Sequence, residues 1–265
     1  MFYQGIIRKM KSQLEEPVQY MLPIDKDSIS MNNFIGKYIL FKYENQIYCI
    51  GCGRKTNKSF AQGFCYPCFI NSPETSECIL RPQLCQAQDG IARNMEWAKT
   101  HCLQDHFVYL AISSGIKVGV TRSAQIPTRW IDQGAWQAIK LAQTPNRYIA
   151  GLIEVALKEH ISDRTQWQRM LKNELVEGID LLNKKDEMLA LLSSDLRKYG
   201  CSDTKITEIT YPVNEYPKKV KSLSFDKITE IEGVLAGIKG QYLLFDNGEV
   251  LNIRKHNGYK VSLEV

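Results

Sequence analysis

The sequence has no long hydrophobic run, since no apolar stretch approaches the ~18–20 residues that a membrane-spanning helix needs. The first residues, MFYQGIIRKMK, lack the charged and then apolar pattern of a secretory signal. The chain also has no internal repeat, no low-complexity tract and no Gly-rich phosphate-binding loop. These absences argue against a membrane protein and a P-loop enzyme, and we expect a cytoplasmic protein without a membrane partner.

The composition of the 265 residues is that of an ordinary globular protein, with 44% hydrophobic and 24% charged residues. The formal net charge of +5 is concentrated in residues 107–172, which hold nine Lys and Arg residues against four Asp and Glu residues. Such a basic segment suits a polyanionic partner such as DNA or RNA. An excess of this size is also common on soluble surfaces, so charge alone leaves both interpretations open.

The first cysteine cluster has the spacing C-x2-C-x12-C-x2-C and consists of Cys49, Cys52, Cys65 and Cys68. Two C-x2-C pairs can place four thiolates tetrahedrally around one ion. Zn²⁺ suits soft sulfur ligands, and a reducing cytoplasm keeps the thiols free to bind it. The alternatives are an iron–sulfur cluster, which also takes four thiolates, and disulfides or scattered buried thiols. We expect a zinc module here.

A second group of candidate ligands follows with less regular spacing: Cys78, Cys85, Cys102 and His106, with His101 as a substitute for His106. A set of three cysteines and one histidine can close a structural zinc site. The segment has few long apolar runs and can bury little core, so a metal would explain how it stays ordered. Buried thiols and an unrelated histidine are the alternative. We therefore expect one or two Zn²⁺ ions per chain.

Basic and aromatic residues lie between the two C-x2-C pairs. Arg54, Lys55 and Lys58 are followed closely by Phe60 and Phe64. Such a mixture could contact phosphates and stack on bases. The rings could equally pack against the small zinc module. The three basic residues are candidate nucleic-acid ligands.

The central segment starts with two short apolar runs, 107–112 and 116–121, separated by Ser113, Ser114 and Gly115. This pattern predicts a β-hairpin. Residues 125–143 predict a helix that is interrupted or capped near Gly134. Residues 146–160 predict a second helix, because their apolar residues recur at i, i+3, i+4, i+7 and i+8.

The two ends of the chain are both rich in strand-forming residues. Residues 43–46 predict a hairpin turn, and the Asn-Gly pairs at 247–248 and 257–258 predict two more. Residues 174–199 predict a helix. The N-terminal strands could complete a small barrel or sandwich with the C-terminal ones, which would bring the termini together.

The chain is therefore predicted to be an α+β protein with five parts. These are a β-rich segment (1–48), a zinc-binding module (49–106), a central α/β domain (107–172), a helical spacer (173–204) and a β-rich domain (205–265).

The order of elements and residues in the central domain resembles the GIY-YIG nuclease superfamily. Tyr109 in VYLA matches the tyrosine of the first strand, and KVGVT, residues 117–121, matches the glycine-containing motif of the second strand. Arg129 matches the arginine of the following helix, and Glu154 matches the metal-binding glutamate of a later helix. The chain departs from the family where Lys117 stands in place of the second tyrosine, and the late asparagine has no secure equivalent.

This resemblance implies a hydrolysis of phosphodiester bonds that depends on Mg²⁺ or Mn²⁺. It implies that Tyr109 helps to activate the nucleophile, that Glu154 holds the cation and that Arg129 stabilises negative charge. Lys117 would occupy the same catalytic site. A cation and a fixed guanidinium suit this chemistry, because a phosphodiester gathers charge in its transition state.

A longer pattern is more specific. CGRKTNKSFAQGFCYPCF, the later HC pair, VYLAISSGIKVGVTR and IPTRWIDQGA look like the uncharacterised bacterial family catalogued as domain of unknown function 2797. The resemblance covers most of the chain and implies no established activity.

Three functions follow from these patterns. The first is a zinc protein that engages nucleic acid as a divalent-metal-dependent nuclease, with Arg122 and Arg147 among its nucleic-acid ligands. The second is a nucleic-acid-binding module without catalysis. The third is a zinc-stapled scaffold for protein interactions.

Overall fold

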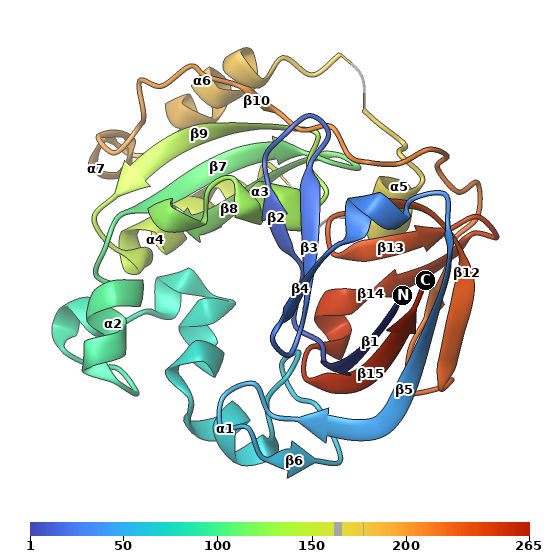
Figure 1. The fold of residues 1–265 in the computed structure, drawn as a ribbon. Coiled ribbons are helices and arrows are strands. Elements are labelled where there is room, and N and C mark those ends of the chain that lie inside the picture. Colours follow the sequence, from blue (N-terminus) through green and yellow to red (C-terminus); the bar gives the residue numbers. More distant parts are fainter. Residues whose placement is uncertain (162–165, 177) are drawn as a thin grey trace.

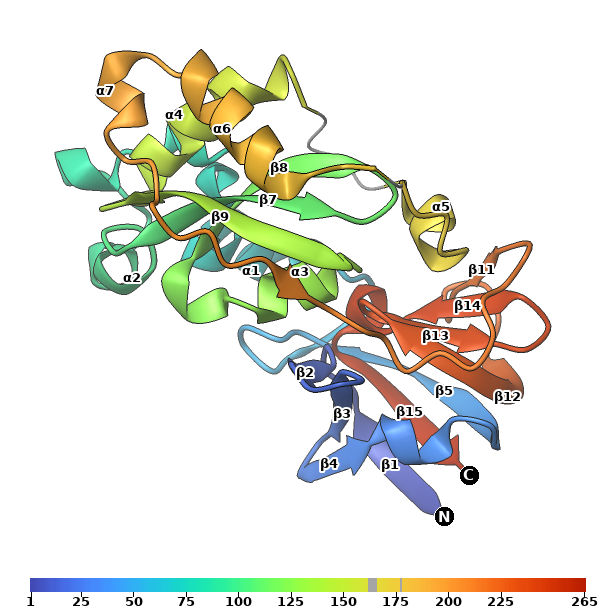
Figure 2. The same ribbon diagram turned by 90° about the horizontal axis from the view of Figure 1, so that it is seen from above.

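The computed structural model describes residues 1–161, 166–176 and 178–265. The described chain is a mixed α+β fold with three sheets and short helices around them (Figure 1). In Figure 2 the large sheet, built from the two ends of the chain, lies on one side, and the central four-stranded sheet lies on the other. No helix in these ranges has both the length and the apolar character that crossing a bilayer requires.

The largest sheet joins strands from both ends of the chain. Its order is β1 (Phe2–Ile6), β15 (Tyr259–Glu264), β5 (Tyr38–Tyr48), β12 (Glu230–Lys239), β13 (Tyr242–Phe245), β14 (Glu249–Asn252) and β11 (Lys221–Leu223), and β6 (Lys55–Thr56) pairs with β5. A small sheet of β2 (Lys11–Gln13), β3 (Gln19–Ile24) and β4 (Asp27–Ser30) lies beside it. Because β1 and β15 pair, the amino group of Met1 donates a hydrogen bond to the Val265 carbonyl.

Of the expected small barrel or sandwich, the closed barrel is not formed. Within the described residues, β1 pairs with β15 alone and β11 pairs with β14 alone, so the two ends of the large sheet do not meet. The parallel pairing of β11 with β14 follows a long connection rather than a hairpin, and it leaves that edge open. The sheet is strongly curved in Figure 1 but remains open.

The central sheet has the order β10 (Thr207–Glu208), β9 (Gln137–Thr144), β7 (His106–Ile112) and β8 (Ile116–Arg122). The predicted hairpin is confirmed as β7 and β8, joined by residues 113–115. Side chains alternate along β7. Val108, Leu110 and Ile112 join the cluster under α4, while Tyr109 and Ala111 join a cluster shared with the large sheet.

The predicted helix over 146–160 is confirmed as α4 (Arg147–Lys158). Asn146 caps it, since its side-chain oxygen accepts a hydrogen bond from the Ile149 amide at 2.9 Å. Ala150, Ile153 and Leu157 are buried against the central sheet, as the apolar spacing predicted. Arg147 and Glu154 on α4 are buried as well.

The helix expected over 125–143 ends near Gly134, as the capping alternative predicted, and its second half is not helical. α3 (Thr128–Asp132) ends before Gly134, which has a left-handed φ of +68°. Residues 137–144 form β9, paired along its length with β7. Pairing with a distant strand decides this conformation, and the local pattern did not contain that information.

Two of the three predicted hairpin turns are also wrong. The chain does not reverse at 43–46, because β5 continues through it with a bulge opposite β15. Residues 253–256 form a 3-10 turn, so the Asn257-Gly258 pair leads into β15 from that turn. A Cβ on Gly258 would lie 2.2 Å from the Tyr48 carbonyl oxygen, which explains the glycine. The turn at Asn247-Gly248 does join β13 to β14.

The other helices are short. They are α1 (Tyr66–Asn71), α2 (Met95–His101), α5 (Trp167–Leu171), α6 (Leu181–Leu191) and α7 (Ser194–Arg197). The helix predicted over 174–199 is therefore two helices that begin at residue 181, and residue 177 lies outside the described residues. In Figure 2, α6 lies over the same side of the central sheet as α4.

Candidate functional site

The first cysteine cluster brings four thiols together. The sulfur atoms of Cys49, Cys52, Cys65 and Cys68 all lie within 4.8 Å of one another, and those of Cys52 and Cys65 are 3.7 Å apart. Zinc–sulfur bonds of ~2.3 Å in a tetrahedron place the sulfurs ~3.8 Å apart, so this donor set fits Zn²⁺. The four residues could hold one metal ion.

Two backbone turns build this cluster. The Gly53 amide donates to the Cys49 carbonyl at 2.9 Å, and the Phe69 amide donates to the Cys65 carbonyl at 2.8 Å. A Cβ on Gly51 would lie 3.2 Å from the Phe64 ring, so glycine lets the first turn close over that buried ring. Burial raises the pKa of the Cys49 thiol, but backbone hydrogen bonds lower it by more, to about 6. A readily ionised thiol suits a metal ligand.

The second cluster contains three thiols. The sulfur atoms of Cys78, Cys85 and Cys102 lie within 4.8 Å of one another, and the last two residues are buried. Hydrogen bonds from the Cys102 and Cys85 thiols lower the pKa of Cys78 far below its usual value. Three converging thiols, one held as a thiolate, fit a soft metal ion such as Zn²⁺.

The two histidines proposed to complete this set lie beside it. Neither is in the group of ligand atoms within 4.8 Å. The His106 Nδ1 lies 2.7 Å from the Gln104 carbonyl oxygen, and the imidazole of His101 stacks on Trp97 with ring centroids 4.0 Å apart. The His106 Nε2 is buried and has no hydrogen-bond partner among the described residues.

Arg147 connects the second cluster to α4. Its guanidinium donates to the Cys78 sulfur at 3.6 Å and to the His101 carbonyl oxygen at 3.0 Å. One turn further along α4, the 3-10 turn Pro82–Leu84 lies directly on Gly151, where a Cβ would be 2.1 Å from the Gln83 amide nitrogen. The cysteine-containing segment is thus packed onto the central domain.

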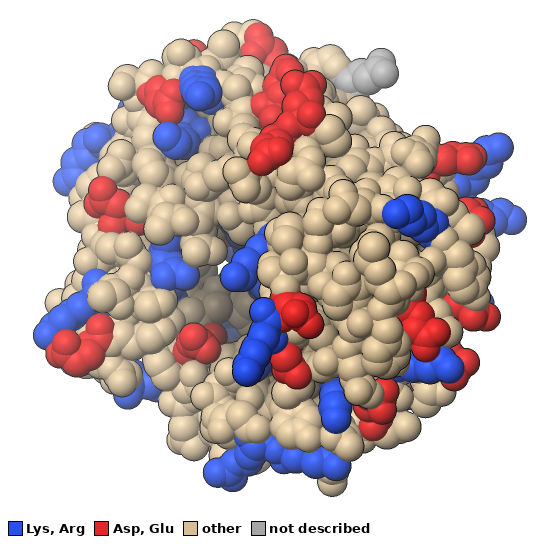
Figure 3. Space-filling model, in the orientation of Figure 1, with Lys and Arg blue, Asp and Glu red and all other residues tan. Residues whose placement is uncertain are grey.

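A cavity of about 290 Å³ lies between the second cluster and the central sheet. Its wall carries three arginines, two histidines and one carboxylate: Arg122, Arg129, Arg147, His101, His106 and Glu74. We call it the arginine-lined cavity. Figure 3 shows a hollow in one face of the molecule, with Lys and Arg as well as Asp and Glu side chains around it. The wall has a clear excess of positive charge.

No carboxylate among the described residues forms an ion pair with the three arginines of this cavity, although Arg147 contacts the Cys78 sulfur at 3.6 Å. No protein acceptor in the described part of the chain hydrogen-bonds the Arg122 guanidinium. Burial lowers the pKa of Arg122, and the neighbouring charge of Arg147 lowers it further. Cys102 and Glu74 raise this pKa only in part, and two guanidinium groups held close together favour an anionic ligand.

The four residues matched to the nuclease superfamily lie around the central sheet. Tyr109 is fully buried, and its hydroxyl accepts a hydrogen bond from the Gln133 side chain at 2.7 Å. Burial raises the pKa of Tyr109, and nearby Arg129 partly offsets this. Lys117 and Glu154 are buried as well, and the Lys158 ammonium is 3.5 Å from the Glu154 carboxylate. Of the four, Arg129 is among the residues that line the arginine-lined cavity.

The glycine of KVGVT has a steric role. Gly119 pairs with Tyr109 across the hairpin, and a Cβ there would lie 2.6 Å from the Tyr109 hydroxyl. The glycine therefore lets the tyrosine ring lie across β8.

The basic residues of the first zinc module are exposed. Arg54, Lys55 and Lys58 lie on its surface, and the Lys58 ammonium is 5.3 Å from the centre of the Phe60 ring. Phe60 stacks on Phe69, and Phe64 is buried beside the cysteines. The rings thus pack within the module.

The sequence suggested that Arg122, Arg129 and Arg147 could lie on one basic face, but it could not show that they converge on one cavity. Sequence reasoning also missed Glu74 and Gln125, which lie in the same wall. These residues come from separate turns, strands and helices, and no local spacing links them.

Comparison with protein families gives one finding. A family model described as "Protein of unknown function (DUF2797)" matches residues 36–261. Searches of curated proteins and of solved structures gave no match.

Proposed function

The chain belongs to the DUF2797 family of proteins of unknown function, so we propose a function from its own geometry: it is a zinc-stabilised protein that binds nucleic acid through the arginine-lined cavity. The observation that carries this proposal is the convergence of Arg122, Arg129 and Arg147 on one wall. Guanidinium groups are the usual side-chain ligands of phosphate, since their paired N–H donors match two phosphate oxygens.

The charge of the wall favours phosphate over other ligands. Its three arginines face one carboxylate, that of Glu74, and the sulfur of Cys78. The central segment that supplies them also carries the net positive charge of the chain. Phosphates of DNA or RNA contribute most of the affinity in nucleic-acid complexes, so such a site is suited to a polynucleotide.

The proposed role of the second metal is to hold the cavity in shape. Cys78 belongs to the cluster and also lies in the cavity wall. The Arg147 guanidinium contacts its sulfur at 3.6 Å. A Zn²⁺ ion on the three thiols would fix these loops, which have little hydrophobic core of their own.

A nuclease of the GIY-YIG type is the second candidate. It is favoured by Arg129. This residue lines the cavity, and its charge and hydrogen bond lower the pKa of the Tyr109 hydroxyl. The burial of Tyr109 and Glu154 in this conformation favours binding over cleavage as the primary proposal. If cleavage occurs, Glu154→Gln should abolish it in Mg²⁺ or Mn²⁺ while oligonucleotide binding persists.

The test is a binding titration with labelled single-stranded and duplex DNA and RNA at low salt. Arg122→Ala should weaken binding about tenfold or more, since a charge-assisted hydrogen bond contributes ~1.5–3 kcal/mol. The double variant Lys218→Ala/Lys219→Ala removes two exposed charges elsewhere and serves as the control. An equal loss of affinity in Arg122→Ala and in the double lysine variant would refute the proposal. So would a zinc-loaded wild type that binds none of the oligonucleotides.

A further inference from the structure

The three cysteines of the second cluster all line one pocket. This pocket has a volume of about 270 Å³ and is formed by residues 73–93 together with α2 and Cys102. Apolar and charged side chains form other parts of its wall, among them Leu84, Ile91, Trp97, Glu77 and Arg93. We call it the thiol pocket. An ion bound to Cys78, Cys85 and Cys102 would lie at its wall.

The thiol pocket is larger than a metal ion needs. The three sulfur atoms lie within 4.8 Å of one another, and an ion at ~2.3 Å from each of them fits in the space between them. A water molecule in the liquid takes up about 30 Å³, so the volume of the pocket leaves room for several further atoms. A small molecule could therefore reach the ion from the pocket.

Within the described residues, no fourth His, Cys, Asp or Glu ligand atom meets the three sulfurs. His101 and His106 line the arginine-lined cavity and not the thiol pocket, and the imidazole of His101 stacks on Trp97. Glu77 lines the pocket, but its carboxylate pairs with Arg81 at 3.0 Å. Zinc sites with three protein ligands keep a fourth position for water or a bound molecule.

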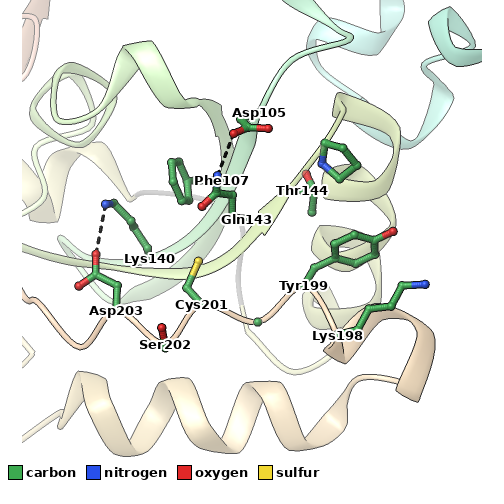
Figure 4. Close-up of a pocket in the computed structure, with 12 residues that line it drawn as sticks. Asp105, Phe107, Lys140, Gln143, Thr144, Lys198, Tyr199, Cys201, Ser202 and Asp203 are labelled. Carbon is green, nitrogen blue, oxygen red and sulfur yellow. Dashed lines mark hydrogen bonds and ion pairs between the residues drawn. The ribbon is translucent and has the colours of Figure 1, made fainter.

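The one cysteine outside the two clusters lies in a different cavity. Cys201 is half-buried in the wall of an open groove of about 520 Å³ between β9 and residues 198–203 (Figure 4). In Figure 4 its side chain points from that segment toward β9, close to the pair of Lys140 and Asp203. The other seven cysteines belong to the two clusters. The chain thus has no further thiol at the second cluster.

We propose that the metal ion of the second cluster has an open fourth position, which binds the sulfur of a small thiol compound in the thiol pocket. This inference rests on the second metal site of the proposed function and not on nucleic-acid binding. A thiolate is a soft ligand that suits Zn²⁺. The negative charge that it adds is offset by Arg147, which donates to the Cys78 sulfur at 3.6 Å, and by Arg93 in the pocket wall. The apolar part of the wall suits the carbon atoms of the compound.

The experiment uses protein loaded with Co²⁺ in place of Zn²⁺, because each cobalt–thiolate bond adds to the charge-transfer absorption. The protein is titrated with 2-mercaptoethanol while a phosphine keeps its cysteines reduced. The absorption should rise to a plateau about one seventh higher, since an eighth thiolate joins the seven of the two clusters. Ethylene glycol, which has oxygen in place of the sulfur, should leave the absorption unchanged. The bound cobalt, measured after desalting, should stay constant.

Four variants locate the response. Cys78→Ser should lose it, whereas Cys49→Ser, in the first cluster, should keep it. His101→Ala and His106→Ala should respond to 2-mercaptoethanol as the wild type does, because neither imidazole occupies the fourth position.

The outcomes separate this inference from the proposed function. A wild type that does not respond to 2-mercaptoethanol, or that responds equally to ethylene glycol, overturns the thiol assignment. A response that appears only in His101→Ala or His106→Ala shows that this histidine completes the site, and it overturns the open position. Uptake of a single Co²⁺ by the wild type overturns both the open position and the second metal site. Nucleic-acid binding is judged separately, by the titration with Arg122→Ala.

Discussion

At the scale of single residues, Lys239 on β12 is an uncompensated buried charge. Its ammonium donates to the Asn173 side-chain oxygen at 2.7 Å and lies 5.3 Å and 5.0 Å from the ring centres of Tyr211 and Tyr216. No carboxylate in the described chain forms an ion pair with it. Burial lowers the pKa of Lys239 to about 8. The unfolded chain, with the ordinary lysine pKa, keeps its proton to a higher pH.

This pKa predicts a rise in stability with pH. Between about pH 8 and pH 10.5 the unfolded state binds more protons than the folded state, so the free energy of unfolding should rise by up to ~3 kcal/mol. Lys239→Met should remove this rise and stabilise the protein at pH 7, because it keeps the length of the side chain without its charge. Denaturant unfolding of both proteins at several pH values measures the difference. Parallel pH profiles would show that Lys239 is not the cause.

At the scale of elements, the contact between α4 and the turn Pro82–Leu84 depends on one glycine. A side chain at Gly151 would collide with backbone atoms of Gln83 at 2.1 Å. Backbone cannot move aside as a flexible side chain can, so the turn would have to shift as a unit. That shift would displace Cys78 and Cys85, which lie on either side of it.

Gly151→Ala should therefore destabilise the protein by ~1–3 kcal/mol through overpacking, although alanine is favoured over glycine in a helix by about 1 kcal/mol. Thermal unfolding measures this. Val155→Ala, at an exposed position of α4, is the matched control and should be nearly neutral. An unchanged or higher melting temperature for Gly151→Ala would contradict the packing described here.

Substitutions in the two thiol clusters should have different effects on oligonucleotide binding. Protein made without a metal-binding tag should contain two zinc ions per chain, and Cys49→Ser or Cys78→Ser should each lower this to one. Cys78→Ser should also weaken oligonucleotide binding, because Cys78 lies in the arginine-lined cavity, whereas Cys49→Ser should leave it largely intact. Elemental analysis and a binding titration test both points. Wild-type protein with a single zinc that Cys49→Ser abolishes would disprove the second site.

Elements set by local patterns could be predicted from the sequence, and those set by distant pairing could not. The β7–β8 hairpin and α4 follow from a turn signal and an apolar period within a few residues. β9 and the unbroken β5 depend on partners far along the chain. The spacing of Cys49 to Cys68 predicted their convergence, since the ligands of a knuckle are close in sequence. The arginine-lined cavity was beyond prediction, because its residues meet only in the folded chain.

At the scale of the whole molecule, one hydrophobic cluster joins the large sheet to the central domain. Tyr109 and Trp130 belong to the same cluster as Tyr20 and Phe41. Polar contacts reinforce this: the Gln241 side chain donates to Asp132 at 2.8 Å and to the Met10 carbonyl at 3.0 Å. Because Asp132 ends α3, these contacts fix the helix that carries Arg129. The β-rich part thereby supports one wall of the arginine-lined cavity.

The most direct test of nucleic-acid binding at that cavity is the salt dependence of affinity. For single strands, the slope of log K against log salt concentration is about −0.7 for each phosphate contact. With a labelled single-stranded oligonucleotide, Arg122→Ala should make the slope shallower by ~0.7, whereas Lys218→Ala/Lys219→Ala should leave it as in the wild type. Identical slopes and affinities for wild type and Arg122→Ala would show that phosphate does not bind in the arginine-lined cavity.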